Sequence, residues 1–203
     1  QANTEGFYYK PRVDKAFLSQ HREGLIALSG CPQGEVPRLI VEGRMEDARQ
    51  AARWHRATFE HFYLEMQRNP IPEMEQINTG IVSLAEAEDI PLVATSDVHY
   101  VFKGDAAAQD LLFCIQTNTS IYDDKRMKME GDYYYLKSPE EMAGLFSDLP
   151  QAVENTRRIA DMCQLEMEFG RLHLPKVDLP QGKDSDEYLA DLCWRGFREH
   201  YSQ

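Results

Sequence analysis

The segment Pro91-Leu92-Val93-Ala94-Thr95-Ser96-Asp97-Val98-His99-Tyr100 is the part of the chain that says most about its fold. A short apolar run, typical of a buried β-strand, ends here directly before an aspartate and a histidine two residues apart. In an extended chain, residues i and i+2 project from the same side, so Asp97 and His99 can converge on one metal ion. The alternative is that Asp97 caps the helix that follows and His99 packs on Tyr100.

Two strand–helix units precede this segment, and a third helix follows it. Apolar runs at residues 25–29 and 62–67 predict strands, and the strand in the opening segment covers 91–95. Helical composition is found over residues 45–60, 73–88 and 104–117. This alternation favours a mainly parallel sheet, either open or closed into a barrel, with site residues gathered at the carboxyl ends of the strands. The predicted fold class is therefore α/β.

The later part of the chain predicts a different arrangement. Residues 132–137 have the composition of a strand, and Ser138-Pro139-Glu140-Glu141 matches a helix start. A second helix is expected over residues 150–164. Prolines and glycines predict an extended connector over residues 170–182, and an amphipathic helix is expected over 184–201.

Composition limits the class of protein. The 203 residues, 42% of them hydrophobic, suffice for one large domain or one domain plus part of another. The formal charge of −12 argues against a grip on a DNA phosphate backbone by this chain itself. No apolar run is long enough to cross a bilayer and no signal peptide is evident, so the expected location is the cytoplasm. The chain begins with Gln, which suggests an excised fragment. The four cysteines form no C-x-x-C pair, so neither a disulfide framework nor a zinc knuckle is expected.

Three further residues are candidates for a site. Cys31 follows the first strand, where a thiolate could bind zinc, although a buried and inert cysteine is the commoner case. Glu65 lies in an otherwise apolar strand, so it either faces solvent or points into a barrel mouth to meet a cation. His21 precedes the first strand and could line a site, lie on the surface or serve as a structural hydrogen-bonding group.

Several segments together resemble one family. Gly6–Asp14, His21–Cys31 and Ala94–Tyr100 resemble the later part of the polymerase-and-histidinol-phosphatase (PHP) domain of bacterial DNA polymerase III alpha subunits. Tyr135–Met142 and Asn155–Ala160 are similar to the segments that follow in those subunits. The resemblance covers nearly the whole chain, and the motifs occur in the family's order.

The resemblance implies a distorted seven-stranded (β/α)7 barrel of the PHP type, of which this chain would form part, followed by a helical segment. The barrel mouth would bind zinc or manganese through about nine side chains, and the positions that match here are Cys31, Asp97 and His99. The remaining ligands would precede Gln1. Residues 1–168 would be the later part of the PHP domain, and residues 169–203 the connector and first helix of the palm domain.

The resemblance also implies a parent enzyme that synthesises DNA by template-directed nucleotidyl transfer. Its partners would be DNA, deoxynucleoside triphosphates and the other holoenzyme subunits, and Mg²⁺ would be held by palm carboxylates outside this chain. Intact PHP sites in the family can support a metal-dependent 3′–5′ exonuclease. Two alternatives stay open: a non-catalytic interaction module of the replisome, and a stand-alone PHP phosphoesterase. The chain alone is expected to be inactive, because three ligands are too few for a metal cluster.

Overall fold

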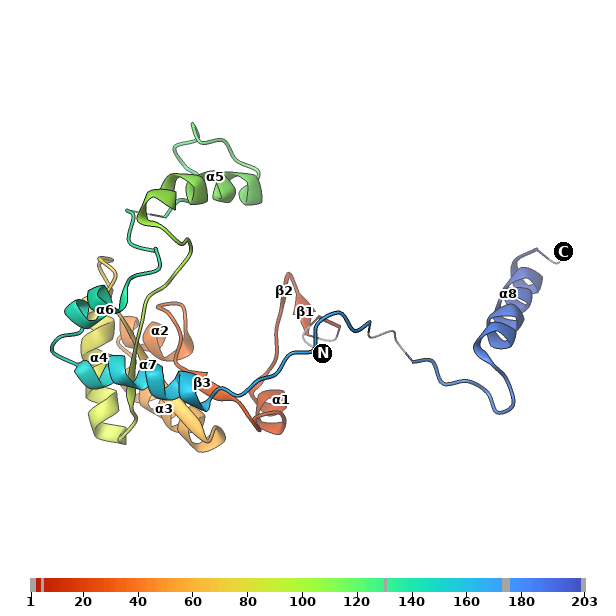
Figure 1. Ribbon diagram of the computed structural model, residues 1–203, viewed down its shortest axis with the longest axis horizontal. Helices are drawn as coiled ribbons and strands as arrows, with labels where there is room; N and C mark the ends of the chain where they lie inside the picture. The colour runs from red at the N-terminus through yellow and green to blue at the C-terminus, as the bar shows by residue number, and fades with distance from the viewer. Residues whose placement is uncertain (1–2, 5, 130, 173–175, 202–203) are drawn as a thin grey trace. The chain divides into compact units, whose positions relative to one another are not determined.

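The structure is a computed structural model that describes residues 3–4, 6–129, 131–172 and 176–201. The chain divides into two units, Gln1–Gln164 and Leu165–Gln203. The first unit is a mixed α/β structure (Figure 1), and the described part of the second contains the helix α8 (Ser185–Tyr201). The candidate site lies in the first unit.

A three-stranded parallel sheet forms the centre of the first unit. Its strands are β3 (Ile26–Leu28), β4 (His61–Gln67) and β5 (Leu92–Thr95), in the order β3-β4-β5. Ala27 lies opposite Phe62, and Met66 lies opposite Ala94. The middle strand is the longest and is mostly buried, as expected for a parallel strand covered on both faces. Because all three strands run in the same direction, their carboxyl ends meet at one edge.

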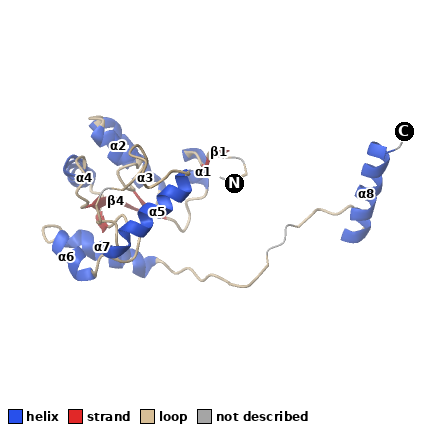
Figure 2. Ribbon diagram, turned by 90° about the horizontal axis from the view of Figure 1, so that it is seen from above, coloured by secondary structure: helices blue, strands red, loops and turns tan. Residues whose placement is uncertain are grey.

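Helices cover both faces of this sheet. Figure 2 shows the strands between α2 (Glu35–Val41) and α4 (Met74–Glu88) on one side and α6 (Pro139–Leu145) and α7 (Pro150–Met162) on the other. Alternate side chains of β4 enter the core together with residues of α2, α3 (Met45–Thr58) and α4. These residues include Phe62, Leu64 and Met66 from the strand and Ile40, Ala52 and Ile81 from the helices.

The helices α2 and α4 approach each other closely at Gly80. A Cβ atom added at Gly80 would lie 2.6 Å from Ile40 Cγ2, which is shorter than a van der Waals contact. Ile40 is itself buried, with 2% of its surface exposed. A glycine is therefore required at this crossing by space, although it is a poor helix former.

Helix α7 covers the edge strand β5. Asn155 is buried in α7, and its Nδ2 donates a hydrogen bond to the backbone oxygen of Leu92 at 2.7 Å. This bond satisfies one of the carbonyl groups that an edge strand leaves unpaired. Phe146, at the end of α6, and Ala152 of α7 complete the core on this side.

The remaining elements are short or lie apart from the sheet. An antiparallel pair, β1 (Phe7–Tyr8) and β2 (Lys10–Pro11), precedes α1 (Lys15–Gln20), and the 3-10 helix η1 (Lys103–Asp105) leads into α5 (Ala106–Thr117). Among the described residues, none of the helices combines the length and apolar character that crossing a bilayer requires.

The predicted alternation of strands and helices is confirmed, with ends that shift by a few residues. Two predictions about elements are wrong. The sequence predicts no helix between the strand at residues 25–29 and the helix at residues 45–60, where turn residues indicate a connection, yet this stretch contains α2, whose Val36, Leu39 and Ile40 are buried. Residues 132–137 form no strand and contribute only an isolated bridge between Tyr135 and Tyr100. The described residues form an open sheet and no closed barrel, so the barrel part of the prediction stays untested.

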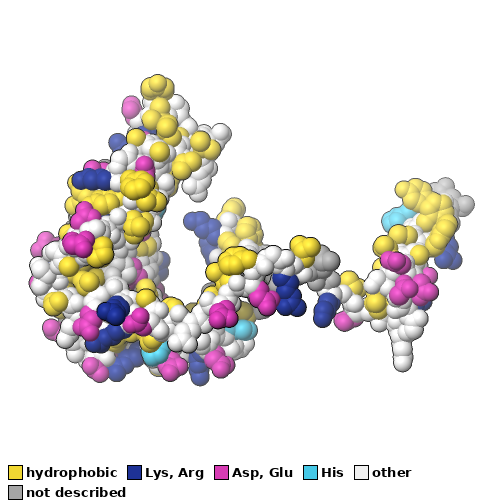
Figure 3. Space-filling model, in the orientation of Figure 1, with side chains coloured by type: hydrophobic (Ala, Val, Ile, Leu, Met, Phe, Trp, Pro, Cys, Tyr) yellow, Lys and Arg dark blue, Asp and Glu magenta, His cyan; other side chains and the backbone are white. Residues whose placement is uncertain are grey.

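Acidic and basic side chains are interspersed over the face of the first unit that Figure 3 shows. The chain as a whole carries 34 acidic and 22 basic residues. Duplex DNA is held by rows of basic side chains, and the visible described part of this face shows no such row.

Candidate functional site at the carboxyl edge of the sheet

Hydrogen bonds hold Glu65 at the carboxyl edge of the sheet. Thr95 Oγ1 donates to Glu65 Oε1 at 2.5 Å, and Gln67 Nε2 donates to the same oxygen at 2.9 Å. The backbone nitrogen of Glu65 donates to Ser29 Oγ at 2.8 Å. These partners come from all three strands or from the residue after them. Glu65 therefore neither extends into bulk solvent nor stands alone, and its carboxylate is positioned by the ends of the strands.

Asp97 and His99 lie in the loop that follows β5. His99 Nδ1 is 2.9 Å from the backbone oxygen of Asp97 and 3.8 Å from its carboxylate oxygen Oδ1. The ring of His99 meets the ring of Tyr134 edge-on, with centroids 5.5 Å apart. About a third of each of the Asp97 and His99 side chains is exposed. A histidine whose Nδ1 donates to a carbonyl presents Nε2 to a ligand, which is the arrangement common in metal sites.

Cys31 and His21 have different settings. Cys31 is a half-buried free thiol in the turn after β3, and its backbone oxygen accepts a hydrogen bond from Gly34. His21 follows α1 and bonds through Nδ1 to the backbone oxygen of Phe17 at 2.9 Å, with its ring stacked on Phe17. His21 precedes the amino end of β3, so it lies away from the carboxyl edge of the sheet. Its hydrogen-bond partner is the nearby residue Phe17.

The predicted ligands do not form a metal site by themselves. Among the described residues, no group of three or more His, Cys, Asp or Glu side chains is close enough to hold an ion. Cys31 follows β3, whereas Asp97 and His99 follow β5, and β4 lies between these two strands. Two strand spacings amount to about 10 Å, whereas zinc ligands lie about 2.0–2.3 Å from the metal. The donor types suit zinc or manganese, but the three residues are not placed to hold an ion by themselves.

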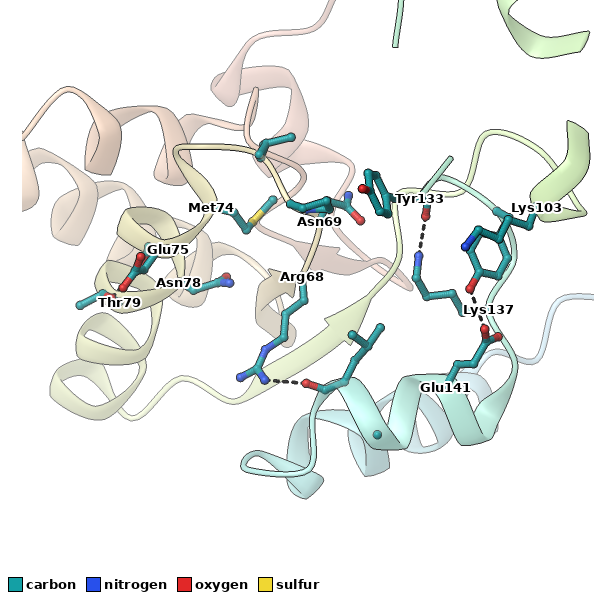
Figure 4. Close-up of a pocket in the computed structure, with 15 residues that line it drawn as sticks. Arg68, Asn69, Met74, Glu75, Asn78, Thr79, Lys103, Tyr133, Lys137 and Glu141 are labelled. Carbon is teal, nitrogen blue, oxygen red and sulfur yellow. Dashed lines mark hydrogen bonds between the residues drawn. The ribbon is translucent and has the colours of Figure 1, made fainter. Parts of the chain in front are cut away.

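A cavity of about 900 Å³ adjoins this edge of the sheet (Figure 4). It lies among the loop after β4, the first half of α4, the segment before α6 and α6 itself. Lys137 joins the cavity wall to the loop that carries Asp97, because its Nζ donates to Ser96 Oγ at 3.1 Å and to the backbone oxygen of Tyr133 at 2.5 Å. The backbone nitrogen of His99 donates to the backbone oxygen of Tyr134 at 2.8 Å.

Two charged groups of this cavity are stabilised within the fold. Arg68 donates to the backbone oxygen of Leu145 at 2.5 Å and to the Asp148 carboxylate at 2.7 Å, and its guanidinium lies over the ring of Phe146. Tyr135 donates to Glu141 at 2.6 Å. This hydrogen bond raises the pKa of Tyr135 and lowers that of Glu141. The bonds attach the cavity wall to α6.

Sequence reasoning missed this cavity. Its lining comes from residues 68–79, Lys103 and residues 133–145, which lie far apart in the chain, and no local pattern marks them as neighbours. The sequence around Lys137 and Glu141 indicates only a strand and a helix start.

The chain matches one known family over part of its length and is similar to known proteins over nearly all of it. Residues 1–69 match the family described as PHP domain, a match that includes Cys31 and Glu65 and ends before Asp97. The chain is 42% identical over 200 residues to the DNA polymerase III subunit alpha of Borreliella burgdorferi, covering 97% of this chain and 17% of the relative. It is 41% identical over 205 residues to that of Treponema pallidum, covering 100% of this chain and 18% of the relative.

A third relative, the DNA polymerase III subunit alpha of Deinococcus radiodurans, is 36% identical over 208 residues, which cover 98% of this chain and 15% of the relative. The chain thus spans less than a fifth of the length of the curated relatives it matches.

Proposed function

Because the chain is similar over nearly its whole length to one segment of the DNA polymerase III alpha subunits, we propose that it is such a segment of a replicative DNA polymerase. The full-length protein would carry out template-directed DNA synthesis in the cytoplasm, with DNA, deoxynucleoside triphosphates and other holoenzyme subunits as partners. Mg²⁺ for nucleotidyl transfer would be held by palm carboxylates outside this chain. The single observation that carries the proposal is the 42% identity over 97% of the chain.

Within that protein, residues 1–168 would belong to the PHP domain and residues 169–203 would lead into the palm. The family match over residues 1–69 supports the first assignment. The compact unit that ends at Gln164 supports a change of domain close to this point.

Cys31, Asp97 and His99 would be three ligands of a zinc or manganese site in the PHP domain. The proposal is supported by their positions after the carboxyl ends of β3 and β5 and by the Nδ1 hydrogen bond of His99. Further ligands from the rest of the protein would have to bridge the gap between the strands. A site completed in that way would support 3′–5′ exonuclease activity.

A structural and interaction module is the second candidate function. It is favoured by the hydrogen bonds that Gln67 and Thr95 donate to Oε1 of Glu65, because they give this carboxylate partners within the protein. In this case the PHP domain would stabilise the polymerase and contact other subunits without chemistry of its own.

Metal content separates the two functions. Zinc and manganese would be measured by elemental analysis on the full-length protein, its Asp97→Ala/His99→Ala variant and a Glu60→Ala/His61→Ala control. The control removes another acid–histidine pair, at the amino end of β4. Metal that is present in the wild type and the control but lost from the first variant supports the metal site. Protein without metal in all three forms, after growth with both ions, supports the structural module.

A further inference from the structure

We propose that the cavity of Figure 4 binds one nucleotide unit, either free or at the end of a single strand of DNA, with the phosphate at Lys137 and the base at Tyr133. The inference rests on the proposed function, because DNA would be the substrate of the full-length protein. Binding of a nucleotide in this cavity requires no metal, so the experiment can refute it without refuting the metal site, and the reverse.

The size and lining of the cavity suit such a ligand. Its volume of about 900 Å³ lies in the range of small-molecule sites, which is about 300–1,000 Å³. Ile71, Met74 and Leu145 provide an apolar surface, and Asn69 provides an amide that can bond to the edge of a base. An apolar surface with a few polar groups is typical of sites that hold a planar organic ligand.

Lys137 provides a positive charge that is not neutralised by a nearby carboxylate. Its ammonium donates to two neutral oxygens, on Ser96 and Tyr133, and among the described residues it forms no salt bridge with a carboxylate. The ammonium also lies 4.8 Å from the centroid of the Tyr135 ring, a contact weaker than one with an anion, so the third of its donors can turn to a ligand. Burial lowers the pKa of Lys137, in keeping with an ammonium that has no carboxylate bonded to it. A phosphate would supply the missing negative charge.

The nearest acidic side chain of the lining, Glu141, does not take this role. Its two oxygens accept hydrogen bonds from Tyr135 and from the backbone nitrogen of Ser138. Lys103 of η1 also lines the cavity, but its side chain is more than half exposed and its ammonium is paired with Asp132 at 3.5 Å, so it is not counted toward the ligand. In a chain with a net charge of −12, the cavity therefore offers an anion the ammonium of Lys137, for which no carboxylate partner is found among the described residues.

Tyr133 is positioned to stack on a base. Its side chain is 42% exposed and lines the cavity. The ring lies close to Gly131, where an added Cβ would be 2.2 Å from Cε2 of Tyr133 and 2.6 Å from Cδ2. The backbone of Gly131 has a φ of 78°, which a glycine adopts without strain. The ring is therefore held against the backbone at Gly131, while part of its surface stays exposed at the cavity. Aromatic rings that are fixed in this way are the usual platforms for single-stranded nucleic acid.

The test measures protection of Lys137 from acetylation in the full-length protein. The protein would be treated with an acetylating N-hydroxysuccinimide ester in the presence of EDTA, and each lysine followed by peptide mass spectrometry. The probes are deoxythymidine monophosphate, octathymidylate and inorganic phosphate. Lys125, an exposed lysine after α5, serves as the internal reference.

We expect deoxythymidine monophosphate to slow the acetylation of Lys137 several-fold while that of Lys125 stays unchanged. Protection by octathymidylate at a lower concentration than by the mononucleotide would identify a strand end as the ligand, and the reverse order a free nucleotide. In the Tyr133→Leu variant, protection of Lys137 should require a nucleotide concentration about tenfold higher than in the wild type. Without nucleotide, Lys137 should be acetylated at the same rate in both proteins.

Two results would overturn the proposal. The first is no protection of Lys137 by either nucleotide probe at concentrations up to about 10 mM. The second is equal protection by inorganic phosphate and by nucleotide in both the wild type and Tyr133→Leu, which would show an anion site without base recognition. Loss of metal in Asp97→Ala/His99→Ala with protection retained would leave both proposals standing, since the two sites would then act independently.

Discussion

Replacing Gly80 with alanine should destabilise the fold, although the same change stabilises most helices. Gly80 lies in the middle of α4, where alanine is favoured over glycine by about 1 kcal/mol. The new Cβ would lie 2.6, 3.0 and 3.1 Å from Cγ2, Cδ1 and Cγ1 of Ile40. Overpacking of a core costs about 1–3 kcal/mol, and the β-branched side chain of Ile40 has little freedom to move away. We therefore expect a net loss of about 1 kcal/mol in the free energy of unfolding.

A second substitution isolates the cause. In an Ile40→Ala background the three contacting atoms are gone, so Gly80→Ala should become stabilising by about 1 kcal/mol. Ile40→Ala alone should cost about 2–5 kcal/mol, because it leaves a cavity in the core. The coupling between the two positions, worked from the two opposite effects of Gly80→Ala, is then about 2 kcal/mol.

The assay is urea unfolding followed by circular dichroism, applied to the wild type, the two single variants and the double variant. Gly144→Ala is the matched control, because Gly144 also lies in a helix and nothing is within 4 Å of an added Cβ there. The control should be neutral or stabilising by up to about 1 kcal/mol. A stabilising Gly80→Ala in the wild-type background, or the same sign in both backgrounds, would refute the steric reasoning.

Two further predictions concern pH and helix capping. Burial lowers the pKa of His55 from 6.5, and the hydrogen bond to Glu35 offsets this only in part. The contribution of His55 to the free energy of unfolding should therefore be complete above about pH 6.5. It should fall below that pH, because the histidine then takes up a proton more readily in the unfolded chain. Chemical denaturation between pH 7 and 5 should show a steeper loss for the wild type than for His55→Phe, and parallel curves would contradict this. Ser138→Ala removes the N-cap of α6 and should lower the free energy of unfolding by about 1 kcal/mol. Ser138→Asp should keep most of the stability of the wild type, because aspartate is also a good N-cap. An alanine variant as stable as the aspartate variant would show that the cap contributes nothing.

Local sequence patterns were sufficient to predict the strands and helices whose characteristic residues lie close together in the chain. The strands were visible because each is an apolar run bounded by turn residues, as at residues 62–67. The start of α6 was visible because Ser138, Pro139 and Glu141 form a capping box, which depends on residues three apart. The same holds for Asp97 and His99, whose spacing brings them within 3.8 Å.

Local patterns were misleading where distant partners decide the conformation. Residues 132–137 have three consecutive tyrosines and strand composition, but the backbone oxygen of Tyr134 bonds to His99 rather than to a neighbouring strand. Helix α2 is only seven residues long and contains Pro37, so its pattern is too short to separate from a turn. Its stability comes from burial against α3 and α4.

By itself, the sequence determined the alternation of strands and helices, the pairing of Asp97 with His99 and the resemblance to one segment of a polymerase subunit. Only the tertiary structure decided the strand order, which separates Cys31 from Asp97 and His99 by the width of β4. It alone also placed Lys137 beside Ser96 and formed the cavity next to them. The physical reason is that strand order and cavities arise from packing between residues far apart in the chain, whereas residue patterns report only the preferences of near neighbours.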